Sequence, residues 1–195
     1  MADDIVYVSR VGFGADYAWS SKVLDQGQKG EVLGVGQNGL SLEEEGFDIK
    51  LLSQSELDHA MPYVRQAVTS LRRPIIISPY GLKYMQRDWH VIKDVDAVLA
   101  VGCFGGNHGV KVAEGTGYVC QMYANLCKEN GKEPNMWLFE MKACAWFRYD
   151  PSDESWKELE GAPMCPRLAG FKRVALIAIR NLTAAGQEAI KNMEL

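Results

Sequence analysis

Two glycine-rich turns in the chain each join a predicted strand to a predicted helix, at residues 9–16 and 114–118. Glycine allows a phosphate group to approach the backbone closely. The first N–H groups of a helix are unpaired and attract anions, and the helix dipole adds to this attraction. The two turns therefore predict a phosphate-binding site, with these candidate members: Ser9, Gly12, Gly14, Asp16, Arg87, Gly102, Glu114, Gly115, Thr116, Gly117 and Arg180.

Two arginines and two carboxylates would give this site its charges. Arg87 and Arg180 are candidate partners of the phosphate, because a guanidinium can donate two parallel hydrogen bonds to it. Asp16 and Glu114 could accept hydrogen bonds from ribose hydroxyls. They are also the candidate catalytic groups if the site cleaves an N-glycosidic bond, which requires a group that stabilises positive charge or activates water. As alternatives, Asp16 could cap its helix, and an arginine on a helix is normally solvated.

Other kinds of catalytic site find little support in the sequence. Cys103 follows the central predicted strand and could be a nucleophile, although a cysteine there is more often buried and inert. The sequence contains neither a recognisable Ser-His-Asp pattern nor a zinc signature, and its five cysteines include no C-x-x-C pair. We therefore expect no metal and no cofactor, and we expect the thiols to be reduced.

The composition limits the classes of function. The chain has 195 residues, 47% of them hydrophobic, which is enough for one domain with a sizeable core. Its net charge of −4 disfavours a general affinity for duplex nucleic acid, which needs a basic surface. Because no segment has the pattern of a signal peptide or a membrane span, we expect a cytoplasmic protein without a membrane partner.

Hydrophobic patterning predicts the elements that would position the candidate residues. Nearly unbroken apolar or β-branched runs are typical of buried strands and predict strands at residues 5–9, 47–52, 94–102, 136–139 and 174–179. Periodic apolar residues and a helix-starting proline predict helices at residues 17–24, after residue 62, at 84–93, from 118 onward and at 183–191. This alternation of strands and helices predicts an α/β fold with a mainly parallel sheet, in a single domain.

Three details of this prediction concern polar or aromatic segments. Residues 27–45 are rich in Gly, Gln and Glu and predict a long irregular loop. Residues 145–156 predict an aromatic hairpin around a Pro-Ser-Asp turn, whose rings either join the core or line a pocket. In the helix at 84–93, the predicted buried face contains Met85, Trp89 and Ile92 and leaves out Arg87 and Asp88.

Several stretches resemble, in the same order, the SLOG superfamily, which includes cytokinin-activating LOG proteins and DprA- and YpsA-like proteins. Residues 9–16 are similar to the Ser-Gly-Gly-Ala-x-Gly-Ala-Asp turn of bacterial and phage members. The other similar stretches are Gln-Arg-Asp-Trp at 86–89, the strand at 97–102, Glu-Gly-Thr-Gly-Tyr at 114–118 with Gln-Met at 121–122, and residues 177–182. The resemblance spans most of the chain. It implies a Rossmann-like three-layer fold that binds a nucleotide or its derivative at the carboxyl edge of the sheet.

Two features depart from the family pattern. Arg10 and Val11 stand where the first turn has paired glycines. The LOG enzymes carry Pro-Gly-Gly-x-Gly-Thr-x-x-Glu, and aligning its Gly-Thr with Gly115 and Thr116 places Val119 at the catalytic glutamate. The resemblance therefore favours a binding protein over a phosphoribohydrolase like the LOG enzymes.

The function that we expect is binding of a nucleotide-derived ligand, as a sensor or a sponge for a signalling nucleotide such as an ADP-ribose derivative or a cyclic nucleotide. One alternative is a nucleotide N-glycosidase that uses Glu114 and Asp16. A further alternative is a DprA-like protein that binds single-stranded DNA, which the acidic balance disfavours. We also expect a homo-oligomer, because SLOG-like proteins commonly associate and because Trp146 and Trp156 could supply apolar surface.

Overall fold

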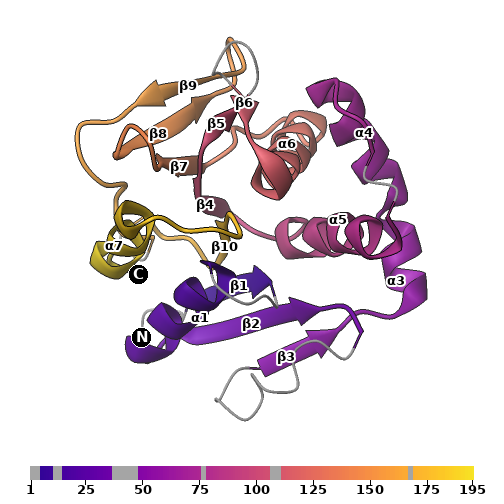
Figure 1. The fold of residues 1–195 in the computed structure, drawn as a ribbon, viewed down its shortest axis with the longest axis horizontal. Coiled ribbons are helices and arrows are strands. Elements are labelled where there is room, and N and C mark those ends of the chain that lie inside the picture. Colours follow the sequence, from indigo (N-terminus) through magenta and orange to yellow (C-terminus); the bar gives the residue numbers. More distant parts are fainter. Residues whose placement is uncertain (1–4, 11–14, 37–47, 76–77, 106–110, 167–168) are drawn as a thin grey trace.

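The structure is a computed structural model that describes residues 5–10, 15–36, 48–75, 78–105, 111–166 and 169–195. Its centre is an eight-stranded sheet with the order β3-β2-β1-β10-β4-β7-β8-β9 (Figure 1). The strands of this sheet are β1 Val6–Arg10, β2 Lys29–Gly34, β3 Asp48–Leu51, β4 Ala97–Gly102, β7 Met136–Glu140, β8 Ala145–Asp150, β9 Ser155–Glu158 and β10 Arg173–Ala178. Five neighbouring pairs are parallel, and the pairs β7–β8 and β8–β9 are antiparallel. The predicted α/β fold with a mainly parallel sheet is confirmed.

Helices cover both faces of the sheet and make it the middle of three layers (Figure 1). One face carries α1 Ala15–Asp25 and α7 Ala184–Asn192. The other face carries α5 Pro79–Ile92 and α6 Glu114–Glu129, and α3 Gln54–His59 and α4 Met61–Leu71 pack against these two helices. A short separate hairpin, β5 Phe104–Gly105 and β6 Lys111–Val112, precedes α6. Within the described part of the chain, every helix is too short or too polar to cross a membrane.

The core has two halves because β4 is buried on both of its faces. All six residues of β4 are buried, as the apolar run predicts. Val98 and Ala100 pack with α4, α5 and α6, whereas Leu99 and Val101 pack with α1 and α7. Successive side chains of a strand point to opposite faces, so one strand contributes to both halves.

The segment 27–45 differs from its prediction as a long loop. Lys29–Gly34 forms β2, which pairs in parallel with β1 on one side and β3 on the other. Polar and glycine residues at the start of β2 hide the strand pattern, because pairing on both sides decides strand formation more than local propensity does. Residues 37–47 lie outside the described part of the chain.

The connections of the sheet reverse direction at its centre (Figure 1). The chain runs from β1 to β2 and β3 on one side, and later from β4 to β7, β8 and β9 on the other. It then returns to insert β10 between β1 and β4. In open parallel sheets, ligands bind outside the carboxyl ends of the strands at such a reversal. The carboxyl ends of β1, β10 and β4 are therefore where a ligand site is expected.

Candidate functional site

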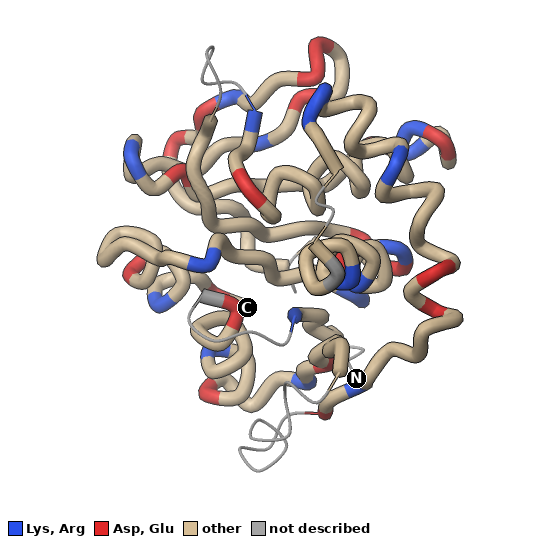
Figure 2. The backbone as a smooth tube through the Cα atoms, turned by 45° about the vertical axis from the view of Figure 1, so that its right-hand side comes forward, with Lys and Arg blue, Asp and Glu red and all other residues tan. Residues whose placement is uncertain are grey.

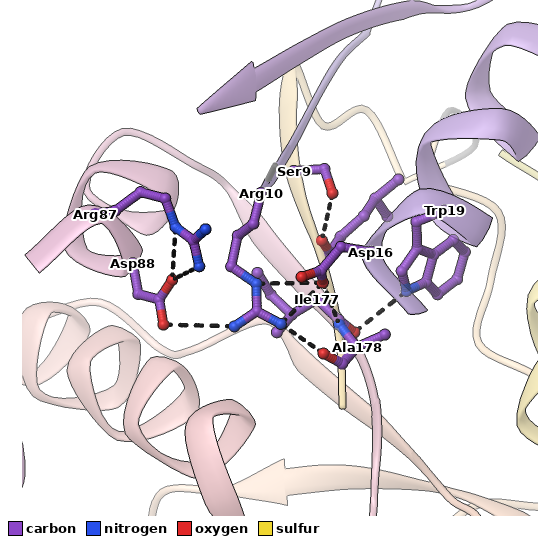
Figure 3. Close-up of polar contacts among 9 residues, drawn as sticks. Ser9, Arg10, Asp16, Trp19, Arg87, Asp88, Ile177 and Ala178 are labelled. Atoms are coloured by element: carbon purple, nitrogen blue, oxygen red, sulfur yellow. Dashed lines mark hydrogen bonds and ion pairs between the residues drawn. The ribbon is translucent and has the colours of Figure 1, made fainter. Parts of the chain in front are cut away.

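Side-chain hydrogen bonds link β1 and β10 beyond the last pair of their ladder (Figure 3). The ladder between these strands ends at Val8 and Ala175. Beyond it, the hydroxyl of Ser9 donates to the carbonyl of Leu176 over 3.3 Å. The backbone N–H of Ala178 donates to Oδ1 of Asp16 over 3.2 Å. These contacts satisfy backbone groups that would otherwise be buried without a partner.

Arg10, the last residue of β1, is the centre of this arrangement (Figure 3). Its Nε and Nη2 atoms donate to Oδ1 of Asp16 over 3.2 and 2.8 Å, and Nη2 also donates to the carbonyl of Ala178 over 2.5 Å. Its Nη1 atom donates to Oδ2 of Asp88 over 3.4 Å. The guanidinium thus connects β1, the first turn of α1, the end of β10 and the middle of α5.

The second arginine of the cluster, Arg87, contacts the same aspartate. Its Nε and Nη2 atoms donate to Oδ1 of Asp88 over 3.2 and 2.9 Å, and its guanidinium lies over the ring of Tyr84. Arg87 and Asp88 are buried, so the prediction that they lie outside the buried face of their helix is wrong. Their burial is tolerated because Arg87 and Asp88 neutralise each other and Asp88 also pairs with Arg10. The sequence pattern of a single helix shows neither of these ion pairs.

The cluster combines two arginines with two aspartates, so its formal charges balance. Burial alone would lower the pKa of Arg10, but the carboxylates of Asp16 and Asp88 outweigh burial and raise this pKa above its ordinary value. Arg10 therefore stays charged at every physiological pH. Asp16 is the second residue of α1, and its carboxylate pairs with Arg10, so the alternative that it caps this helix is wrong.

The first turn of α6 lies next to Arg10. A Cβ built on Gly115 would stand 4.0 Å from Nη1 of Arg10, and this is the nearest atom that it would meet. Thr116, the next residue, is 1% exposed, and its Oγ1 atom has no hydrogen-bond partner among the described residues. Glu114 is exposed and has a φ of 51°, a left-handed backbone that is unusual for glutamate. Such backbone strain is often found at functional sites.

Of the two other glycines of the predicted site that the structure describes, Gly117 is required by packing and Gly102 is not. A Cβ on Gly117 would collide with the carbonyl oxygen of Val112 and stand 2.7 Å from Nη1 of Arg73. Close approach of α6 to β6 therefore requires glycine at position 117. Gly102 ends β4, and its carbonyl accepts a hydrogen bond from the N–H of Met141.

The structure thus brings some of the predicted site residues together and leaves others apart. Ser9, Asp16, Arg87 and Gly115 all lie around Arg10. Arg180 follows β10 at the same edge of the sheet and is exposed. Gly12 and Gly14 lie outside the described residues.

Three residues at this edge of the sheet were missed by the sequence analysis as site residues: Arg10, Asp88 and Glu140. Arg10 was visible as the departure from the glycine pair of the first turn, but nothing local revealed its partners. Asp88 pairs with it across 78 positions of the sequence. Glu140, buried at the end of β7, accepts hydrogen bonds from the backbone N–H groups of Phe104, Lys142 and Ala143. Glu140 therefore links the start of β5 to the turn that follows β7.

Cys103 lacks the surroundings of a catalytic nucleophile. It is half-buried, and burial together with the negative charge of Glu140 raises the pKa of its thiol. A raised pKa lowers the fraction of reactive thiolate. No group of His, Cys, Asp and Glu side chains among the described residues could hold a metal ion.

The rings of the aromatic hairpin were expected either to join the core or to line a pocket, and the structure shows both. Trp146 is buried in the half of the core that contains α1 and α7. Tyr149 and Trp156 line a pocket of about 60 Å³ between the hairpin and α6, beside Gln121 and Gly117. The apolar surface that was expected to support self-association is thus largely used within the chain, and the homo-oligomer stays a prediction.

The described backbone carries basic and acidic residues interspersed along its length (Figure 2). A protein that binds single-stranded nucleic acid without sequence preference usually has a continuous basic groove with stacked aromatic rings. The net charge of −4 disfavours such a groove, and with it the DNA-binding alternative.

Comparisons of the chain with protein-family models, with curated proteins and with solved structures found no match.

Proposed function

We propose that this protein binds a nucleotide or a nucleotide-derived ligand, and that it holds the ligand's phosphate at the carboxyl edge of the sheet between α1 and α6. The observation that carries the proposal is the position of the Arg10 guanidinium, a buried and permanently charged cation beside the first turn of α6. A cation and the N-terminus of a helix both attract a phosphate, and their effects add.

Three further observations support the proposal. The site coincides with the reversal of connections at the centre of the sheet, where such folds bind ligands. Arg180 is exposed at the same edge and could contact a second phosphate or a carboxylate. The family resemblance of the two turns points to the same class of ligand.

Binding without cleavage is the form of the proposal that the carboxylates favour. Oδ1 of Asp16 already accepts three hydrogen bonds, two from Arg10 and one from Ala178. All three donors belong to the chain itself, so this oxygen is already engaged and is poorly placed to activate a water molecule. Glu114 is exposed and stands at the start of α6, where it could contact a ribose hydroxyl. A sensor or a sponge for a signalling nucleotide is therefore our first choice, and an N-glycosidase that uses Glu114 is the second.

Calorimetry with AMP, ADP-ribose and cyclic AMP, followed by chromatography of each mixture, tests the proposal. We expect the wild-type protein to bind at least one of these nucleotides and to release no free base. Glu114→Gln should change affinity modestly, and Glu160→Gln, at an exposed position two residues after the end of β9, is the control. Gly115→Leu should abolish binding by filling the space beside Arg10.

Two results would change the conclusion. Release of free base by the wild type that is lost in Glu114→Gln would establish the hydrolase instead. No binding of any nucleotide in the panel would refute both functions.

A further inference from the structure

The guanidinium of Arg10 has one donor more than the cluster uses. A guanidinium carries five N–H groups, and four of those of Arg10 have acceptors: one on Nε, two on Nη2 and one on Nη1. Within the described part of the chain, the second N–H of Nη1 has no acceptor. The side chain is only 6% exposed, and a buried charged donor without an acceptor is costly.

This donor belongs to the atom of Arg10 that lies nearest to α6. Nη1 stands 4.0 Å from the Cβ position of Gly115. Thr116, on the same turn, brings a second buried polar atom, Oγ1, that has no hydrogen-bond partner among the described residues. Two side-chain groups that lack a partner among the described residues, one on Arg10 beside Gly115 and one on Thr116, therefore occur at the first turn of α6.

The contact between Arg10 and Asp88 is the weakest in the cluster. Nη1 of Arg10 and Oδ2 of Asp88 are 3.4 Å apart, at the limit for a hydrogen bond. Asp88 is held more firmly by Arg87, whose Nε and Nη2 atoms both donate to Oδ1 (Figure 3). Asp88 can therefore lose Arg10 and still keep a charged partner.

We infer that Nη1 of Arg10 is the group that binds the ligand's phosphate, and that Asp88 is an internal carboxylate which this phosphate displaces from Nη1. The inference rests on the proposed function and adds a specificity-determining residue to it. Asp16 and Ala178 keep the rest of the guanidinium in place during the exchange. A tetrahedral group with several charged oxygens suits the site, since one oxygen can face Nη1 while others face the amides of α6.

Matched substitutions can test this exchange by calorimetry with ADP-ribose and with inorganic phosphate. The test variants are Arg10→Met, Arg10→Lys and Asp88→Asn. The controls are Arg173→Met and Glu31→Gln, which break an ion pair of 2.8 Å at the amino end of β10, the opposite end of the same strand. Circular dichroism and thermal unfolding identify which variants fold.

We expect Arg10→Met to weaken binding of both probes by about tenfold or more, the usual loss for one charge-assisted contact. Arg10→Lys should weaken binding less, because lysine keeps the positive charge but lacks the planar guanidinium that can donate several hydrogen bonds at once. Asp88→Asn should bind both probes more tightly than the wild type, since it removes the competing charge. Both control variants should bind like the wild type.

The outcomes separate this inference from the proposed function. If ADP-ribose binds and neither Arg10→Lys nor Asp88→Asn changes its affinity, the inference is wrong and the proposed function stands. If inorganic phosphate binds in a manner that depends on Arg10 and no nucleotide does, the inference stands and the proposed function fails. If the wild type binds neither probe, both fail. Should Arg10→Met not fold, the sign of the effect of Asp88→Asn decides.

Discussion

Gly117 packs so closely against the carbonyl oxygen of Val112 that position 117 has no room for a side chain. Gly115 differs, because the nearest atom to its Cβ position is 4.0 Å away. We expect Gly117→Ala to lower the free energy of unfolding by about 1–3 kcal/mol, the usual cost of overpacking. Gly115→Ala should change it by less than about 0.5 kcal/mol. Urea denaturation of both variants measures the difference, and equal effects would contradict the packing role of Gly117.

The ion pair between Arg10 and Asp16 predicts a large effect on stability. Asp16→Ala would leave the buried guanidinium with less charge compensation and the N–H of Ala178 without its acceptor. Breaking a buried pair by removing one partner costs about 3–5 kcal/mol. The control is Asp153→Ala, which breaks an exposed and solvent-screened pair with Lys157 and should lower stability far less. Similar losses in the two variants, measured by urea denaturation, would show that the cluster around Arg10 is not a stabilising element.

The capping box of α3 predicts a dependence of stability on pH. Hydrogen bonds from the backbone and side chain of Ser53, with help from Lys50, lower the pKa of Glu56 to about 2. Because the folded state lowers this pKa from its ordinary 4.5, the contribution is complete above pH 4.5 and is lost as the pH falls toward about 2. The melting temperatures of wild type and Glu56→Ala should therefore differ at pH 6 and converge near pH 2. A constant difference would refute this role of Glu56, and Glu160→Ala is the exposed control.

Thiol labelling can test whether any cysteine is reactive in the folded protein. Cys144 is exposed, Cys103 is half-buried, and burial raises the pKa of Cys120 to about 12. We therefore expect iodoacetamide to modify Cys144 first, Cys103 much more slowly, and Cys120 only after unfolding. Mass spectrometry of timed samples gives the order. Labelling of Cys103 ahead of Cys144 would restore Cys103 as a candidate nucleophile.

Apolar patterning predicted the centre of the fold well because its strands are buried on both faces. The runs at β4, β7 and β10 are unbroken by polar residues, apart from Glu140 at the end of β7 and Arg173 at the start of β10, and no other element produces such short apolar runs as readily. The strand β2 escaped because it begins with Lys29, Gly30 and Glu31. The conformation of β2 is decided by pairing with β1 and β3, which are not adjacent to it in the sequence.

The sequence predicted the two turns that border the candidate site, but it did not predict the cluster of Arg10, Asp16, Arg87 and Asp88 at its centre. Turns at helix starts depend on local residues, so Asp16 and Gly115 could be chosen from the sequence. The charge partners depend on contacts between β1 and α5, which local patterns do not encode. Arg87 and Asp88 therefore looked like members of a solvated helix face, although they lie in the interior beside Arg10.

The insertion of β10 between β1 and β4 has a consequence for the order in which the protein can fold during its synthesis. Ser9 and Leu176, which are joined by a hydrogen bond, are separated by 167 positions. Until the ribosome has made residues 173–178, β1 and β4 lack the neighbour that they share. The growing chain then presents two apolar strand edges, of the kind that pairs with other chains. We therefore expect the unpaired edges of β1 and β4 to stay open to chaperones or to other chains until β10 has been synthesised.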